Sequence, residues 1–74
     1  MDKDNLLIAF GIKIKQERIK RNLSQEDFAE LTGFHRTYIG MVERAERNIT
    51  LLNIGKFAIS LNLSLNELLD FDAS

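Results

Sequence analysis

The sequence contains no cysteine and no proline, and its only histidine is His35. Without cysteine the 74-residue chain can form neither a disulfide nor a thiolate zinc site, which suits a reducing cytoplasm. A lone histidine with no second histidine or cysteine beside it also argues against a metal site. We therefore expect a cytoplasmic protein that holds neither a metal nor another cofactor.

Long hydrophobic runs and the residue constellations of catalysis are absent as well. The apolar stretch from Leu6 to Phe10 is far shorter than the roughly 20 residues of a membrane-spanning helix, and it follows acidic residues. The sequence has no glycine-rich phosphate loop, no cluster of histidine with carboxylates and no serine beside a base. We expect no signal peptide, no membrane span and no enzymatic activity.

What remains is one small globular domain over residues 1–74, with 45% hydrophobic and 28% charged residues. A core of this size supplies only a few kcal/mol of net stability, and disulfides cannot add to it. Self-association is then the remaining source of extra stability. Size alone is therefore compatible with a homodimer.

The net charge of −1 and the pI of about 5.7 argue at first against nucleic acid, whose partners are usually basic. The charges are unevenly distributed, however. Basic residues gather in two segments and acidic residues near the C-terminus: Lys13, Lys15, Arg18, Lys20 and Arg21; Arg36, Arg44 and Arg47; Glu67, Asp70 and Asp72. Either one surface is cationic on an acidic protein, or each basic run is merely a solvated helix face.

The apolar residues repeat at helical rather than alternating spacing, which predicts an all-α protein. Five helices are expected, at about residues 4–21, 25–31, 36–44, 51–61 and 65–70. Three of them begin with residues that cap helices well: Ser24 with Asp27, Thr50, and Ser64 with Glu67. Gly33 can adopt positive φ, which fits a tight turn between the second and third helices.

Two short helices joined by a turn that contains glycine are typical of a helix-turn-helix, whose second helix enters the major groove of DNA. Ala29 is small where the two helices must approach, Gly33 lies at the turn, and Ile39 and Val42 supply the inward contacts of the later helix. A plain αα-hairpin shares this pattern, so the motif alone leaves that alternative open.

Residues 24–44 resemble the helix-turn-helix of the lambda-repressor-like, or XRE-type, family, and the five-helix pattern over about residues 6–70 resembles that fold. A narrower resemblance, to the controller proteins of restriction-modification systems, is carried by Leu23-Ser24-Gln25-Glu26, His35-Arg36-Thr37-Tyr38-Ile39, Glu43-Arg44 with Arg47-Asn48-Ile49, and Leu52-Asn53-Ile54. It implies a homodimer that binds a palindromic operator in double-stranded DNA and regulates its own and the endonuclease gene, with RNA polymerase as a further partner. A phage-type repressor and an antitoxin-like protein-interaction module are the alternatives.

The third helix supplies the candidate readers of DNA sequence. Arg36 lies in the first turn, the end that usually reaches base edges, and its guanidinium can bridge guanine O6 and N7. Thr37 either contacts a thymine methyl and a phosphate or simply faces solvent. Tyr38 either reaches the DNA backbone or packs on the first helix. Arg44 shares the outward face with Thr37. Gly40 lies beside them and either lets the helix sit close to DNA or is simply a tolerated glycine.

Four further residues are candidates for contacts to the DNA backbone. The resemblance assigns Gln25, at the start of the second helix, to a phosphate, and capping support is the alternative. It assigns Arg47 and Asn48 to phosphate or the adjoining groove, unless they are ordinary loop residues. His35 stands at a cap position without being a usual capping residue, and it either touches a phosphate when protonated or has only a surface role.

Glu43 lies on the inward stripe of the third helix with Ile39 and Val42, and Arg18 continues the inward stripe of the first helix. A buried charge needs a partner inside the protein. We therefore predict a partly buried ion pair between Arg18 and Glu43, an arrangement that the lambda-repressor-like family also shows. Glu43 is then structural rather than catalytic.

The C-terminal third holds more apolar residues than a short terminal helix can bury: Leu61, Leu63, Leu65, Leu68, Leu69 and Phe71. We predict a two-fold dimer interface built from the fifth helix and the adjoining part of the fourth, and we assign to it Leu65, Leu68, Leu69 and Phe71. Such a dimer would present two recognition helices to major grooves about 34 Å apart. The alternative is that all six residues close the monomer's own core.

Overall fold

The computed structural model describes residues 2–72, and this part of the chain forms five α-helices and no strand. The helices are α1 (Lys3–Lys20), α2 (Gln25–Thr32), α3 (Arg36–Glu43), α4 (Leu51–Leu61) and α5 (Leu65–Leu68). The predicted all-α fold is confirmed. None of the helices described has both the length and the apolar character that crossing a bilayer requires.

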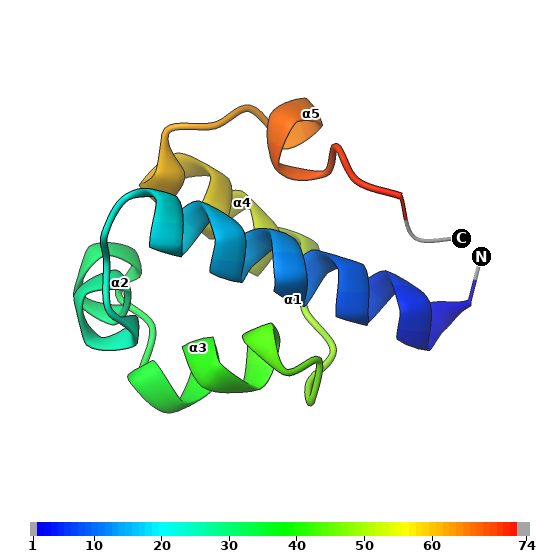
Figure 1. Ribbon diagram of the computed structural model, residues 1–74, viewed down its shortest axis with the longest axis horizontal. Coiled ribbons are helices and arrows are strands. Elements are labelled where there is room, and N and C mark those ends of the chain that lie inside the picture. The colour runs from blue at the N-terminus through cyan, green and yellow to red at the C-terminus, as the bar shows by residue number, and fades with distance from the viewer. Residues whose placement is uncertain (1, 73–74) are drawn as a thin grey trace.

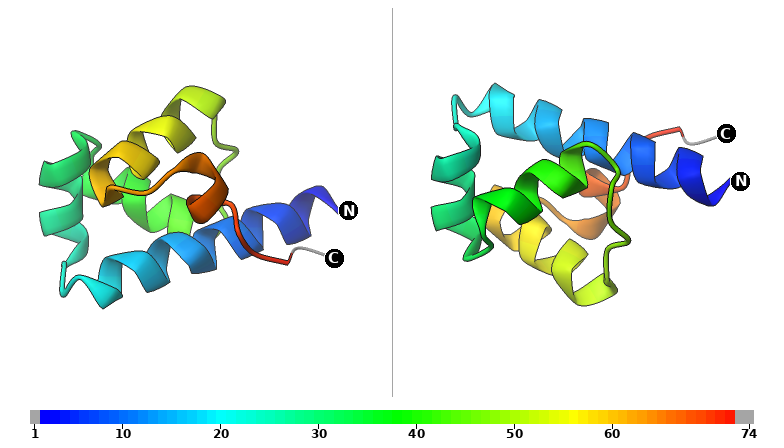
Figure 2. Two further views of the ribbon diagram at one scale, coloured as in Figure 1. Left: turned by 90° about the horizontal axis from the view of Figure 1, so that it is seen from above. Right: turned by 90° about the horizontal axis from the view of Figure 1, so that it is seen from below.

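The five helices leave α3 with one face on the outside of the molecule. α1 and α4 form the middle, with α3 on one side of them and α5 on the other, while α2 crosses one end (Figure 1). Views from above and below show α5 and α3 on these two opposite sides (Figure 2).

The core takes buried apolar residues from all five helices: Phe10, Ile14, Phe28, Ile39, Val42, Phe57, Ala58, Leu61 and Leu68. Aromatic rings occupy its centre. The ring centroid of Phe57 lies 5.0 Å from that of Phe34, 5.6 Å from Phe28 and 6.2 Å from Phe10. α4 therefore packs through one side chain against both α1 and the helix-turn-helix.

The helix starts follow the local capping signals of the sequence. Ser24 Oγ accepts from Asp27 N at 3.0 Å while the Asp27 carboxylate accepts from Ser24 N at 3.1 Å. Ser64 and Glu67 form the same reciprocal pair, and Thr50 Oγ1 accepts from Asn53 N. Gly33 ends α2 with φ of 82°, the left-handed conformation that favours glycine.

A glycine sets the distance between α1 and α3. A methyl group at Gly11 would lie 2.5 Å from the carbonyl oxygen of Val42 and 2.8 Å from that of Glu43. Because these are rigid backbone atoms, no other residue fits without moving the helices apart. Gly11 thereby fixes how far α3 stands out from the core.

α5 is shorter than the predicted helix at residues 65–70, because it ends at Leu68 with Leu69 as its C-cap. The backbone then turns, and Phe71 N donates to the carbonyl of Leu69 at 3.0 Å. This turn brings the Phe71 ring to 6.4 Å from that of Phe10. Packing of Phe71 on α1 replaces a further helical turn.

Candidate nucleic-acid interface

α2 and α3 form a helix-turn-helix whose turn begins at Gly33. Ile39 and Val42 are buried and hold α3 against the core, while Arg36 and Thr37 are exposed on its outer side. A shallow groove on that side, called here the α3 groove, is lined by Gln25, Arg36, Thr37, Gly40 and Arg44. Four of the predicted DNA-binding residues therefore lie together.

Arg36 stands at the start of α3, where its guanidinium pairs with the carboxylate of Glu26 from α2. Both side chains are largely exposed, so water competes with this contact and its contribution is small, about 0.2–1 kcal/mol. The predicted base reader is thus placed at the groove but carries an acidic partner in the free protein.

His35 caps α3 with its ring. Its Nδ1 accepts a hydrogen bond from Thr37 N at 3.1 Å. A ring nitrogen that accepts must be unprotonated, so this cap and a protonated ring that donates from both nitrogens are mutually exclusive. The structure therefore confirms His35 at the cap of α3 and shows that its ring makes the capping hydrogen bond.

Arg44 folds back along α3 and pairs with Glu46, with Nε 2.9 Å from Oε2 and Nη2 3.1 Å from Oε1. This hydrogen bonding raises the pKa of Arg44 and lowers that of Glu46. A methyl group on Gly40 would lie 2.9 Å from Arg44 Nη1. Gly40 is buried beneath Arg44 in the free protein, so close approach of DNA at Gly40 requires Arg44 to move.

Arg18 and Glu43 form a partly buried ion pair between α1 and α3. Glu43 also accepts from Gln25 Nε2 at 3.1 Å, and Arg18 Nη1 donates to the carbonyl of Leu23 at 2.8 Å. These contacts tie Gln25 to α3 and the segment just before α2 to α1. Gln25 therefore enters the α3 groove from a fixed position, with the second hydrogen of its Nε2 available to donate.

Tyr38, Arg47 and Asn53 meet on the flank of α3 that faces α4. The Tyr38 hydroxyl accepts from Asn53 Nδ2 at 3.0 Å, and its ring lies 4.9 Å from that of Phe34. The Arg47 guanidinium lies 5.7 Å from the centroid of the Tyr38 ring, a cation–π contact. These contacts orient Tyr38 toward α4 and the loop before it.

Asn48 lies apart from the α3 groove. It lines an apolar groove between the start of α1 and the segment after α5, together with Leu6, Ile54 and Leu69. The structure therefore does not bring Asn48 to the residues of the α3 groove, and its contact with DNA stays a prediction.

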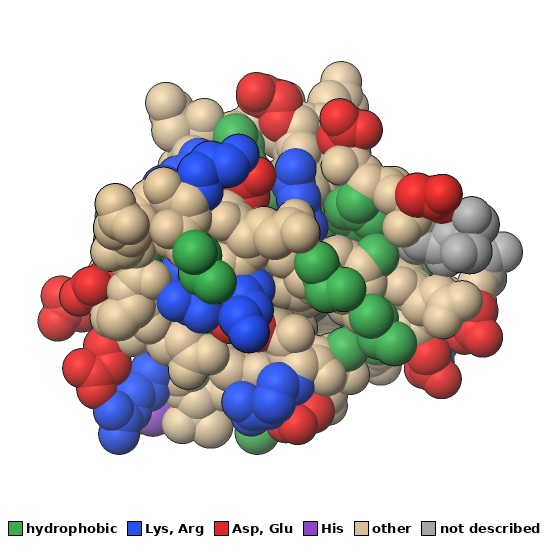
Figure 3. All heavy atoms as spheres, in the orientation of Figure 1, with side chains coloured by type: hydrophobic (Ala, Val, Ile, Leu, Met, Phe, Trp, Pro, Cys, Tyr) green, Lys and Arg blue, Asp and Glu red, His purple; other side chains and the backbone are tan. Residues whose placement is uncertain are grey.

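The surface that includes α2 and α3 carries mixed charge. Figure 3 shows Lys and Arg side chains next to Asp and Glu along the lower edge, where Figure 1 draws these helices. Arg47 and Lys56 differ from Arg36 and Arg44, because neither forms an ion pair among the described residues. Their charges lie over the rings of Tyr38 and Phe34 instead.

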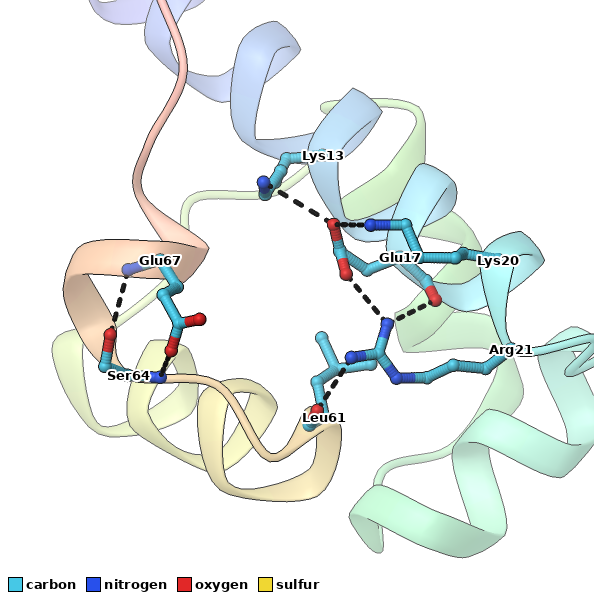
Figure 4. A network of polar contacts seen from close by, with 7 residues as sticks. All are labelled: Lys13, Glu17, Lys20, Arg21, Leu61, Ser64 and Glu67. Carbon is cyan, nitrogen blue, oxygen red and sulfur yellow. Dashed lines mark hydrogen bonds and ion pairs between the residues drawn. The ribbon is translucent and has the colours of Figure 1, made fainter.

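Most of the basic run at residues 13–21 is paired with carboxylates. Lys13, Lys20 and Arg21 surround the buried carboxylate of Glu17, with nitrogen–oxygen distances of 3.5, 3.2 and 2.8 Å (Figure 4). Arg21 Nη2 also donates to the carbonyl of Leu61 at 2.8 Å. The hydrogen bond from Arg21 is the main cause of a lowered pKa of Glu17, and the two lysines lower this pKa further. Burial alone would raise it.

The residues predicted at the dimer interface divide into two groups. Leu68 is completely buried in the monomer and Phe71 is half-buried against Phe10, so Leu68 belongs to the core and not to an exposed interface. Leu65 and Leu69 remain 45% and 41% exposed. A one-turn helix can direct only one of its two adjacent leucines inward.

Sequence reasoning missed several residues around these sites. Leu52 and Ile59 of α4 are 80% and 82% exposed, and their spacing of seven residues places them on one face. That spacing was a signal in the sequence. The sequence contained no comparable signal for Glu26 and Glu46, because the pairing of each with an arginine of the α3 groove depends on how the chain folds.

The helix-turn-helix geometry agrees with a known family. Residues 14–68 match the model of the family described as Helix-turn-helix, HTH_3. The chain belongs to this helix-turn-helix family. Within residues 2–72, the structure of this family member shows no group of three His, Asp or Glu side chains that could hold a metal ion.

Relatives of this helix-turn-helix chain include named restriction-modification controllers. Control protein C.BamHI of Bacillus amyloliquefaciens is 44% identical over 69 residues, which cover 92% of this chain and 85% of that protein. The structure of the controller C.AhdI from Aeromonas hydrophila is similar with a TM-score of 0.79 at 44% identity, over 84% of this chain and 94% of that chain. The structure of the C.Esp1396I tetramer in complex with its natural 35 base-pair operator is similar with a TM-score of 0.78 at 33% identity, over 86% of this chain and 88% of that chain. The predicted resemblance is confirmed.

Proposed function

We propose that this protein is a sequence-specific DNA-binding regulator of transcription, and that it is the controller of a restriction-modification system. The observation that carries the proposal is the α3 groove, where Gln25, Arg36, Thr37 and Arg44 meet on the outer face of a helix-turn-helix. A related chain of 33% identity, C.Esp1396I, is known in complex with its operator. Action on chromosomal DNA implies a cytoplasmic protein.

In the proposed complex α3 lies in the major groove. Arg36 leaves Glu26 and bridges O6 and N7 of a guanine, while Thr37 contacts a neighbouring base edge or phosphate. The exposed ion pairs of Arg36 and Arg44 are weak, so contacts to DNA can replace them. Gln25 Nε2 donates one hydrogen to Glu43 and the other to a phosphate at the start of α2, where backbone N–H groups point outward.

The proposed regulator acts as a two-fold homodimer. Its interface contains exposed apolar residues of α4 and α5: Leu52, Ile59, Leu65 and Leu69. Large exposed apolar residues in such number are costly in a monomer and favour a partner surface. A two-fold axis would place two copies of α3 on successive major grooves, about 34 Å apart on a palindromic operator. The related C.Esp1396I is a tetramer on its operator.

The proposed targets are the promoter of the protein's own gene and that of the endonuclease, with RNA polymerase as the partner through which transcription changes. Footprinting of DNA upstream of the protein's own gene tests this directly. We expect two protected half-sites related by two-fold symmetry, and a methyltransferase or endonuclease gene next door. An unprotected upstream region would contradict autoregulation, and neighbouring genes of another kind would contradict the controller assignment.

A further inference from the structure

We propose that Asn53 is a positioning residue that fixes the Tyr38 hydroxyl as a hydrogen-bond donor to a DNA phosphate. The inference rests on the proposed DNA-binding function and adds a residue from α4 to it. It starts from the hydrogen bond of 3.0 Å between Asn53 Nδ2 and the Tyr38 hydroxyl oxygen. An amide nitrogen can only donate, so the hydroxyl accepts this bond and its own hydrogen must point elsewhere.

The hydroxyl occupies a fixed position because both partners are held. The Tyr38 ring packs on Phe34 with 4.9 Å between centroids and is half-buried. Asn53 lies in the first turn of α4, where its backbone N donates to Thr50 Oγ1 at 3.1 Å. A donor that is already oriented loses less conformational freedom when it binds than a mobile side chain does.

The surrounding charge favours an anionic acceptor. Arg47 lies over the Tyr38 ring and Lys56 over the Phe34 ring, and neither has a carboxylate partner among residues 2–72. Arg36 and Arg44, in the α3 groove, each pair with a glutamate. The flank formed by Tyr38, Arg47 and Asn53 therefore combines a directed donor with available positive charge.

A phosphate oxygen fits this flank better than a base edge does. Phosphates accept hydrogen bonds and carry negative charge, so they complement both the hydroxyl and the guanidinium. Tyr38 also lies on the side of α3 that faces α4, away from the outward face that carries Thr37. The sides of a helix inserted in the major groove meet the backbone that borders the groove.

A double-mutant cycle on operator binding tests the inference. Tyr38→Phe removes the hydroxyl and keeps the ring, and we expect about a tenfold loss of affinity, the usual value of a hydrogen bond to a charged group. Asn53→Ala should lose a similar factor in the wild-type background and almost nothing in the Tyr38→Phe background. The matched control is Asn5→Ala, an exposed residue of α1 outside the Tyr38 flank and the proposed dimer interface, which should bind like wild type.

Circular dichroism melting of each variant distinguishes a loss of binding from a loss of folding. If Asn53→Ala does not fold, Asn53→Leu replaces it, because leucine has nearly the shape of asparagine without the Nδ2 donor. Equal losses from Asn53→Ala in both backgrounds would overturn the inference, and so would no loss in the wild-type background. If the wild-type protein itself shows no preference for operator DNA, the proposed function fails. Sequence-specific binding with additive losses rejects only the role of Asn53.

Discussion

Arg18 and Glu43 join α1 to α3 through two parallel hydrogen bonds, from Nε to Oε2 at 2.7 Å and from Nη2 to Oε1 at 3.1 Å. Their side chains are only 11% and 3% exposed. Removal of one partner leaves the other charge buried without its counter-ion, which costs about 3–5 kcal/mol. We expect Arg18→Met and Glu43→Gln each to lose that much, and the double variant to lose clearly less than the sum. Chemical denaturation measures the cycle, and additive losses would reject an energetic pairing.

The Glu17 cluster predicts an acid-sensitive part of the stability. The pKa of Glu17 lies below its ordinary value of 4.5 in the folded protein, because Arg21 donates to the carboxylate. A carboxyl group with a lowered folded pKa stabilises the fold above its unfolded pKa, and this contribution is lost as pH falls through the lowered value. We expect the free energy of unfolding to fall below about pH 4.5.

Glu17→Gln is the variant that isolates this effect. It should be less stable than wild type at pH 7 and should lose less stability than wild type between pH 5 and pH 3. Some loss remains in both proteins because hydrogen bonding from Ser64 also lowers the pKa of Glu67. Identical pH profiles of urea denaturation for wild type and variant would show that Glu17 does not titrate as described.

Arg36 and Arg47 should differ in what they contribute to DNA binding. Arg36→Ala should lose about 1–3 kcal/mol on the specific site and little on unrelated DNA, because a bidentate base contact discriminates between sequences. Arg47→Ala should weaken binding to the specific site and to unrelated DNA alike. It should also make the dependence of affinity on salt concentration shallower, because a phosphate contact releases counterions. Titrations at several salt concentrations measure both. Equal losses on the two DNAs for Arg36→Ala would reduce Arg36 to a positioning role.

The exposed face of α4 and α5 predicts how the dimer can be broken without unfolding the monomer. Ile59→Asp and Leu69→Asp place a charge on residues that are 82% and 41% exposed, so the monomer should remain helical while dimer formation is lost. Leu68→Asp is the contrasting variant, because Leu68 is fully buried and a charge there should unfold the protein. Sedimentation equilibrium with circular dichroism distinguishes these results. Folded dimers for both Ile59→Asp and Leu69→Asp would place the interface elsewhere.

The parts of the fold that sequence reasoning predicted are those governed by local signals. Ser24 and Ser64 start their helices through partners three residues away, and Gly33 ends one through a conformation that favours glycine. Arg18 and Glu43 could be paired because each lies on an apolar stripe where a single charge cannot stand alone.

The parts that were missed depend on contacts between distant segments. Glu17 lies among polar residues in the sequence, and its burial follows from the turn that brings Leu61 to Arg21. The choice between Leu68 and Leu69 for the core depends on the direction in which the chain leaves α4 at Asn62, where φ is 56°. The partners of Arg36 and Tyr38 come from α2 and α4, so sequence position alone could not identify Glu26 or Asn53.

Selection of binding sites from random double-stranded DNA by the purified protein tests the central claim most directly. We expect enrichment of a palindrome with two half-sites whose centres lie about one helical turn apart, or a multiple of it, with a guanine in each half-site where Arg36 reads it. Recovery of no common sequence, or of a single asymmetric site, would contradict specific recognition by a two-fold dimer through α3.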